Sequence, residues 1–122
     1  LRGPLQAGLV LTRGYDPCIV VYPPDRLSDL AEKVERMPGA SPTTRSFARR
    51  TFGGAYETNL DKMGRVLVPA FLREYAGIEQ EATIVGVNTY LEIWKPERWE
   101  EIKQRDSENM TAILAEMARM GV

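Results

Sequence analysis

Three charged residues around one glycine carry the clearest candidate chemistry in this chain: Asp61, Lys62 and Arg65, with Gly64 between them. An aspartate at the start of a tight turn can accept N–H bonds across it, and glycine supplies the positive φ that such turns often need. Arg65 lies four residues after Asp61, so its guanidinium can meet that carboxylate and be held in a fixed pose. Arg65 and Lys62 at such a tip could contact phosphates or the edge of a guanine. The spacing equally describes an ordinary hairpin with a weak surface ion pair, and both interpretations stay open.

The segments on either side of this turn predict the elements that position it. Residues 54–60 and 65–68 are short strand-like runs, which would place the turn at the tip of a hairpin. Pro69 suits the first turn of a helix, and Gly77 is a candidate C-cap that would end it. Two aromatic residues of this helix are expected in the core rather than as platforms for stacked bases: Phe71 and Tyr75.

The residues needed for common enzyme chemistry are missing from the sequence. The chain has 122 residues and no histidine, which removes the usual triads and most zinc sites. Its single cysteine, Cys18, lies in the apolar run 18–22, so we expect a small core residue and not a nucleophile. Carboxylates alone could still build a hydrolase, yet the sequence shows no phosphate-cradling glycine loop, metal cluster or nucleophile pair. We therefore expect no enzyme activity and no cofactor.

Composition and charge are those of an ordinary globular protein. Hydrophobic residues make up 43% and charged residues 27% of the chain. No apolar run approaches the roughly 18–20 residues of a membrane span, and the first residues lack the pattern of a signal peptide. The expected location is the cytoplasm, with no membrane partner. The net charge of −1 counts mildly against DNA binding, although an acidic helical tail can mask a local basic patch.

A repeat organises most of the chain. Residues 10–30 match residues 82–102 without a gap, at a shift of 72 positions. Each copy predicts the same plan: a strand, a turn, a second strand and a helix that begins at a proline. The predicted strands are 9–12 and 18–22 in the first copy and 82–87 and 90–94 in the second, and the identical positions are Gly14 and Gly86, Pro24 and Pro96, and Arg26 and Arg98.

The same comparison predicts units beyond the matched segments. Residues 1–2 correspond to residues 72–73, the end of a short helix, so a first Asp-x-x-Gly-Arg turn is expected upstream, within roughly 20 further residues. We therefore expect an amino-terminally truncated two-repeat protein. Its predicted units are 1–37, the remainder of the first copy; 38–51, a linker helix; 52–105, the second copy; and 106–122, a helical tail. The tail has an apolar stripe that we expect to pack on the body or on a neighbour, with the body favoured: Met110, Ile113, Leu114 and Met117.

Several ordered segments together resemble one protein family, the MraZ family: residues 60–73, 11–14 with 21–23, 84–87 with 91–94, 41–49 and 52–54. The resemblance implies an α+β fold in which two tandem AbrB-like modules (SpoVT-AbrB domains) interlock through swapped hairpins. These would form a small double-psi-like β-barrel with short flanking helices. It also implies a bacterial transcriptional regulator that works as a ring-shaped homo-oligomer at the nucleoid. Its implied partner is double-stranded DNA with short direct repeats, upstream of the division and cell-wall gene cluster.

The resemblance also assigns a DNA-binding site. The family motif is Asp-x-x-x-Arg, twice per chain, and this sequence matches it once, at Asp61 and Arg65. Arg65 is expected to contact DNA directly, Asp61 to orient it, and Lys62 to contact a phosphate. Three further arginines are expected to support binding, although each could equally be solvated surface or a subunit contact: Arg73, Arg49 and Arg50.

A second class of function stays open on the same residues. AbrB-like barrels also serve as antitoxins or interaction scaffolds, and the apolar stripe of the tail could dock a partner protein in that way. A neighbouring toxin gene would favour this alternative, whereas a neighbouring methyltransferase gene would favour the regulator. Neither interpretation involves a small-molecule substrate.

Overall fold

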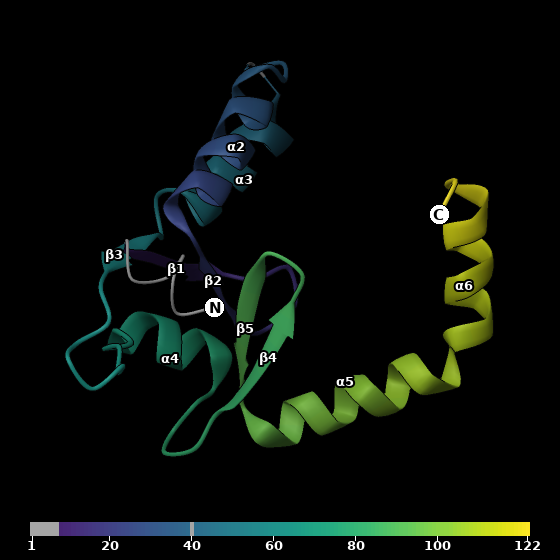
Figure 1. Cartoon of the computed structure of the whole chain (residues 1–122). Helices are drawn as coiled ribbons and strands as arrows, with labels where there is room; N and C mark the ends of the chain where they lie inside the picture. The colour runs from purple at the N-terminus through teal and green to yellow at the C-terminus, as the bar shows by residue number, and fades with distance from the viewer. Residues whose placement is uncertain (1–7, 40) are drawn as a thin grey trace.

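A single antiparallel sheet organises the fold. The computed structural model describes residues 8–39 and 41–122. In this described part the strand order is β3-β1-β2-β5-β4, with helices on and beyond the sheet (Figure 1). The α+β class expected from the sequence is confirmed. The strands are β1 (Leu9–Arg13), β2 (Ile19–Tyr22), β3 (Tyr56–Thr58), β4 (Thr83–Val87) and β5 (Tyr90–Trp94).

Several helix boundaries lie where the prolines and glycines of the sequence predict them. Three of them have a proline in their first turn, where the missing N–H is not needed. The short helix after the tip ends at Gly77, whose φ of 69° is left-handed, as expected of a C-cap. The helices of the described part are α2 (Pro24–Glu35), α3 (Pro42–Thr51), α4 (Ala70–Ala76), α5 (Pro96–Glu108) and α6 (Met110–Arg119).

The two copies of the repeat meet at the centre of the sheet. β2 of the first copy pairs with β5 of the second, with Val20 opposite Glu92. These two residues are equivalent positions of the repeat, so the pairing is symmetric about them, like a local twofold axis. The hairpins β1–β2 and β4–β5 are therefore equivalent halves of one sheet.

The edges of the sheet differ between the halves. β3 lies in the segment predicted as the second copy, residues 52–105. It nevertheless pairs with β1 of the first copy, with Val10 opposite Glu57. A strand from one copy thus extends the hairpin of the other. The equivalent outer edge, on β4, has no partner strand among the described residues. The sheet is open there, and the closed double-psi-like barrel is not seen in the described part.

The core consists of two clusters on opposite faces of the sheet, because side chains alternate along each strand. One cluster lies beneath α4, and the other lies beneath the start of α5. The first contains Leu9, Leu11, Ile19, Val21, Leu72, Ala76 and Ile93, and the second contains Cys18, Val20, Tyr22 and Trp94. Because Leu72 and Ala76 belong to α4 and have no exposed surface, this helix is tied directly to the sheet.

Cys18 is a core residue, as predicted, and has no exposed surface. Burial, followed by the negative charges of Glu92 and Asp16, raises the pKa of its thiol to about 12. The thiolate is the reactive form, so we expect the native protein to resist iodoacetamide at pH 8 while the urea-unfolded chain is labelled. Mass spectrometry would count the added groups. Native labelling at the rate of the unfolded chain would contradict this burial.

Some local expectations are wrong. Residues 65–68 do not form a strand. The turn at residues 61–65, hereafter the tip, therefore has a strand, β3, only on its amino-terminal side. Phe71 is 40% exposed and is not a core residue. Tyr75 is half-buried at the surface of α4. The helix end expected at residues 1–2 lies outside the described residues.

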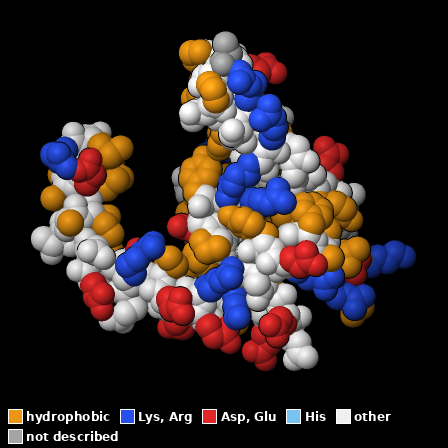
Figure 2. Space-filling view, turned by 180° about the vertical axis from the view of Figure 1, so that it is seen from behind, with side chains coloured by type: hydrophobic (Ala, Val, Ile, Leu, Met, Phe, Trp, Pro, Cys, Tyr) orange, Lys and Arg blue, Asp and Glu red, His pale blue; other side chains and the backbone are white. Residues whose placement is uncertain are grey.

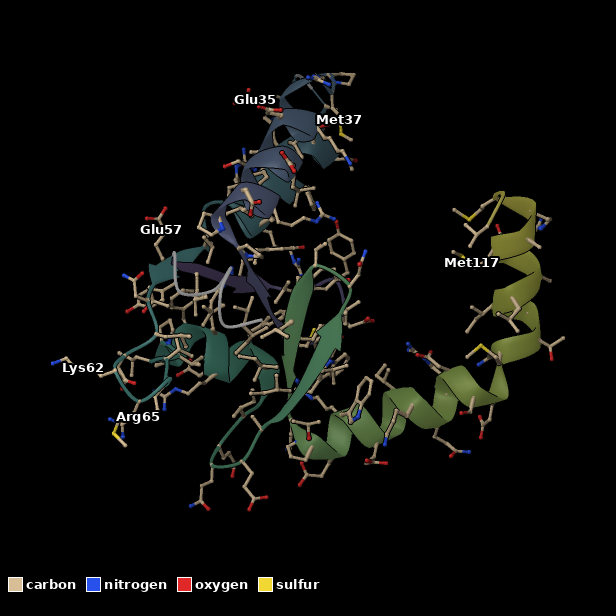
Figure 3. All side chains as sticks on the ribbon, viewed as in Figure 1. Glu35, Met37, Glu57, Lys62, Arg65 and Met117 are labelled. Carbon is tan, nitrogen blue, oxygen red and sulfur yellow. The ribbon has the colours of Figure 1, made fainter. Side chains whose placement is uncertain are left out.

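The tail does not pack on the body. α5 ends at Glu108, and Asn109, with a φ of −106°, separates it from α6. α6 stands apart from the sheet in Figure 1, and the labelled Met117 points into open space in Figure 3. The expectation that the stripe covers the body is wrong, because the bend at Asn109 takes α6 away from it. The stripe residues are between 37% and 61% exposed: Met110, Ile113, Leu114 and Met117.

Candidate nucleic-acid interface

The carboxylate of Asp61 closes the tip, as its position in the sequence predicts. Its Oδ1 accepts the backbone N–H groups of Met63 at 2.9 Å and Arg65 at 2.8 Å. Its backbone N–H donates to the carbonyl of Arg65 at 2.8 Å, and the N–H of Gly64 donates to the carbonyl of Asp61 at 3.0 Å. Gly64 has a φ of 77°, the left-handed conformation that glycine adopts without strain. The turn is therefore held by interactions within five residues.

The same carboxylate fixes the side chain of Arg65. Oδ2 of Asp61 accepts Nε–H of Arg65 at 2.9 Å, while the Arg65 side chain stays 72% exposed. The pKa of Asp61 lies below its usual value, first because of the backbone N–H of Arg65, then because of the Arg65 side chain and the N–H of Met63. An ion pair this exposed adds little stability, so its effect is on geometry. It leaves the outer nitrogens of Arg65 pointing to solvent, where they can bind a ligand.

The tip is anchored to the sheet on both sides. Leu60 before the turn and Val66 and Val68 after it pack against the cluster beneath α4. Lys62 extends away from the body beside Arg65, as the side-chain view shows (Figure 3). Leu67, which alternates with these anchors, is 71% exposed. A rigid base therefore carries two basic side chains into solvent.

The other residues predicted to contact DNA lie on α4 and α3, and they differ in their exposure and hydrogen bonding. Arg73 is exposed in the last turn of α4, and Arg49 is exposed on α3. Arg50, next to Arg49, instead points inward, where its guanidinium bonds the carbonyl of Gly14 and the hydroxyl of Tyr75. Figure 2 shows Lys and Arg side chains on the projecting helices, across the middle of the visible face and at its right-hand edge. Their role in binding stays a prediction.

Sequence reasoning missed the residues that hold α4. The guanidinium of Arg13 lies 5.8 Å from the ring centre of Phe71 and 5.6 Å from that of Tyr75. Arg98 donates from Nη1 to the carbonyl of Tyr75 at 3.4 Å. Arg98 was visible in the sequence as an identity of the repeat, but its contact with α4 depends on the fold. For Arg13 the sequence holds no comparable signal.

Gly77 joins α4 to the strands that follow and has little room for a side chain. Its φ is 69°, and an added Cβ would lie 3.1 Å from the guanidinium of Arg98. We expect Gly77→Ala to lower the free energy of unfolding by about 1–2 kcal/mol, measured by urea denaturation. Gly39→Ala is the matched control, because nothing lies within 4 Å of its Cβ position. Equal effects of the two substitutions would contradict this account.

Membrane-spanning helices and metal-binding clusters are both absent from the described residues. Within residues 8–39 and 41–122, none of the helices combines the length and the apolar character needed to cross a membrane. In those ranges, His, Cys, Asp and Glu side chains do not gather in groups of three or more that could hold a metal ion.

Comparisons with known proteins agree on one family. A family model described as "MraZ protein, putative antitoxin-like" matches residues 51–120. A protein of Thermomicrobium roseum named "Transcriptional regulator MraZ" is 49% identical over 90 residues, which cover 74% of this chain and 63% of that relative. A Clostridium acetobutylicum protein of the same name is 42% identical over 121 residues, covering 99% of this chain and 84% of the relative. One from Moorella thermoacetica is 39% identical over 116 residues, covering 95% and 81%. This chain belongs to the MraZ family.

Proposed function

We propose that this protein is a transcriptional regulator that binds double-stranded promoter DNA through its tip. The observation that carries the proposal is the pose of Arg65, fixed by Asp61 through Nε and exposed at its outer nitrogens. An arginine held in this way can meet the two acceptors of a guanine in the major groove, or a phosphate. Lys62 beside it supplies a phosphate contact. The names of the relatives support the same role.

Supporting contacts come from two exposed arginines outside the tip. Arg73 lies on α4, eight residues after Arg65, and Arg49 lies on α3. We assign both to phosphate contacts, which position a protein on the duplex without reading its sequence. A regulator of this kind acts in the cytoplasm, at the nucleoid, and needs neither catalysis nor a cofactor.

A single tip makes few DNA contacts and would bind with low affinity, so the proposal includes self-assembly. A ring of copies would place several tips at fixed spacing, and short direct repeats in DNA would meet several of them at once. Linked weak contacts raise overall affinity by about 10²–10⁴ when the spacing fits. The exposed stripe of α6 supports assembly, because an apolar helix face of this kind is usually covered by another protein surface.

The proposal also covers the closure of the fold. β4 is an edge strand without charge or proline, and its Ile84 is 65% exposed. Native proteins rarely leave such an edge uncovered. We propose that a strand added to β4 completes a swapped-hairpin barrel from two AbrB-like modules, at residues 1–37 and 52–105. The exchange of β3 onto β1 supports this arrangement.

A titration followed by fluorescence anisotropy tests DNA binding. The full chain is added to a duplex that carries the direct repeats of its own promoter, and to a shuffled duplex of equal length, at two salt concentrations. We expect tight binding to the repeats that weakens as salt rises, because phosphate contacts release counterions. Equal affinity for both duplexes would contradict sequence-specific regulation.

Light scattering tests the role of the tail. We expect the chain to form an oligomer, and Leu114→Glu with Met117→Glu to lower its mass, because the added charges face the proposed interface. Ala112→Glu, on the opposite side of the same exposed helix, is the matched control. A single-subunit mass for the unchanged chain would contradict self-assembly. It would favour the second candidate, an antitoxin-like protein or scaffold whose tail docks a different protein.

A further inference from the structure

Arg50 links three elements that are far apart in the sequence. From the end of α3, its Nη2 donates to the carbonyl of Gly14 and to the hydroxyl of Tyr75, and its Nη1 lies 3.5 Å from the carbonyl of Arg13. The Tyr75 hydroxyl in turn faces the carbonyls of Gly14 at 3.1 Å and Asp16 at 3.4 Å. One guanidinium thus ties α3 and the β1–β2 turn to α4.

The donors of Arg50 are therefore committed inside the molecule. Breaking the charge-assisted hydrogen bonds between this guanidinium and a buried carbonyl would cost free energy. Arg50 is therefore poorly placed to bind a DNA phosphate instead. The guanidinium carbon also lies 5.5 Å from the ring centre of Tyr75, which adds a cation–π contact. Arg49, its neighbour in the chain, is exposed on α3 and is free of these constraints.

Tyr75 is connected to the tip through α4. The chain passes from Arg65 to the N-cap of α4 at Pro69 through Val66 and Val68, both packed against the sheet. Leu72 fixes the inner side of α4. Tyr75, three residues after Leu72, fixes the flank of α4 that faces the β1–β2 turn. Because Val66 and Val68 pack against the cluster that contains Leu72 and Ala76 of α4, we expect a change in the pose of α4 to move the segment that carries Arg65.

We infer that Arg50 is a positioning residue: through Tyr75 it fixes α4 and thereby the direction in which the tip presents Arg65, and it does not itself contact DNA. This inference rests on the proposed function. It separates two adjacent arginines of α3 into an inward positioning residue, Arg50, and an outward residue, Arg49, that is available to phosphate.

Three substitutions in the full chain test this assignment. Arg50→Met removes the donors but keeps an unbranched stem, Tyr75→Phe removes only the hydroxyl, and Arg49→Met is the matched control. The first readout needs no DNA: the amide ¹H–¹⁵N signals of Gly64 and Arg65 at the tip. We expect Arg50→Met and Tyr75→Phe to shift them and Arg49→Met to leave them in place.

The second readout is the anisotropy titration on the repeat duplex at several salt concentrations. Arg50→Met and Tyr75→Phe should weaken binding roughly two- to thirty-fold, the usual range for coupling through packed contacts. The slope of log affinity against log salt should match the unchanged chain, because no phosphate contact is lost. Loss of a phosphate contact would instead lower the slope by about one.

Each other outcome is informative. A slope lower by about one for Arg50→Met, with the tip signals unmoved, would make Arg50 a direct contact and overturn the inference. A loss of thermal stability alone, with the tip signals and affinity unchanged, would also overturn it.

If the unchanged chain binds no repeats, the proposed function fails, while the amide signals still test the link to the tip. If Arg50→Met does not fold, Tyr75→Phe and Arg50→Lys carry the test, and Arg50→Lys should shift the tip because lysine lacks the planar fork.

Discussion

Replacing Arg65 with alanine is expected to weaken binding to the promoter repeats by about 1–3 kcal/mol per tip while leaving the fold intact. The loss follows from the geometry of the tip, where Asp61 holds Nε at 2.9 Å and leaves the outer nitrogens to the ligand. Stability should change little, because the side chain is 72% exposed and exposed ion pairs contribute little. Anisotropy titration and thermal denaturation of the same sample measure the two quantities.

Two further variants sharpen this result. Arg65→Lys keeps the charge but loses the planar fork, so it should retain phosphate attraction and lose discrimination between the repeat and shuffled duplexes. Asp61→Asn removes the charge that orients Arg65 and should weaken binding through the pose of that side chain. If folded Arg65→Ala protein binds the repeats with unchanged affinity, the tip is not the DNA-binding site.

Replacing Leu72 with alanine is expected to lower the free energy of unfolding by about 2–5 kcal/mol. Leu72 has no exposed surface and joins α4 to the sheet, so its truncation removes apolar contacts and leaves a cavity beneath the helix. A change of this size is a large part of the 5–15 kcal/mol that usually separates folded from unfolded domains. Urea denaturation measures it.

Leu67→Ala is the matched control for that change. It removes the same atoms five residues earlier, from a side chain that is 71% exposed, so its effect should stay within about 0.5 kcal/mol. If the two substitutions cost the same, α4 is not anchored as described. A larger effect at Leu67 would point to an interface over that side of the tip.

Interactions within a few residues explain what the sequence by itself determined. The turn at Asp61, the C-cap at Gly77 and the helix starts at proline each depend on backbone geometry over at most five positions. The repeat likewise predicts two equivalent hairpins, and it correctly pairs β1 with β2 and β4 with β5. Cys18 was placed in the core by its apolar neighbours alone.

Contacts between distant segments were decided only by the tertiary structure. The spacing of Arg49 and Arg50 treats the two arginines alike, but the packing of α3 beside the β1–β2 turn gives Arg50 inward partners. Residues 65–68 have the composition of a strand, yet among the described residues they form no ladder with β3, although the outer edge of β3 is open. The apolar stripe of α6 predicts a covered helix, but periodicity does not say what covers it, and the bend at Asn109 keeps it off the body. A side chain's type sets which interactions it can make, and the fold alone decides which of them are within reach.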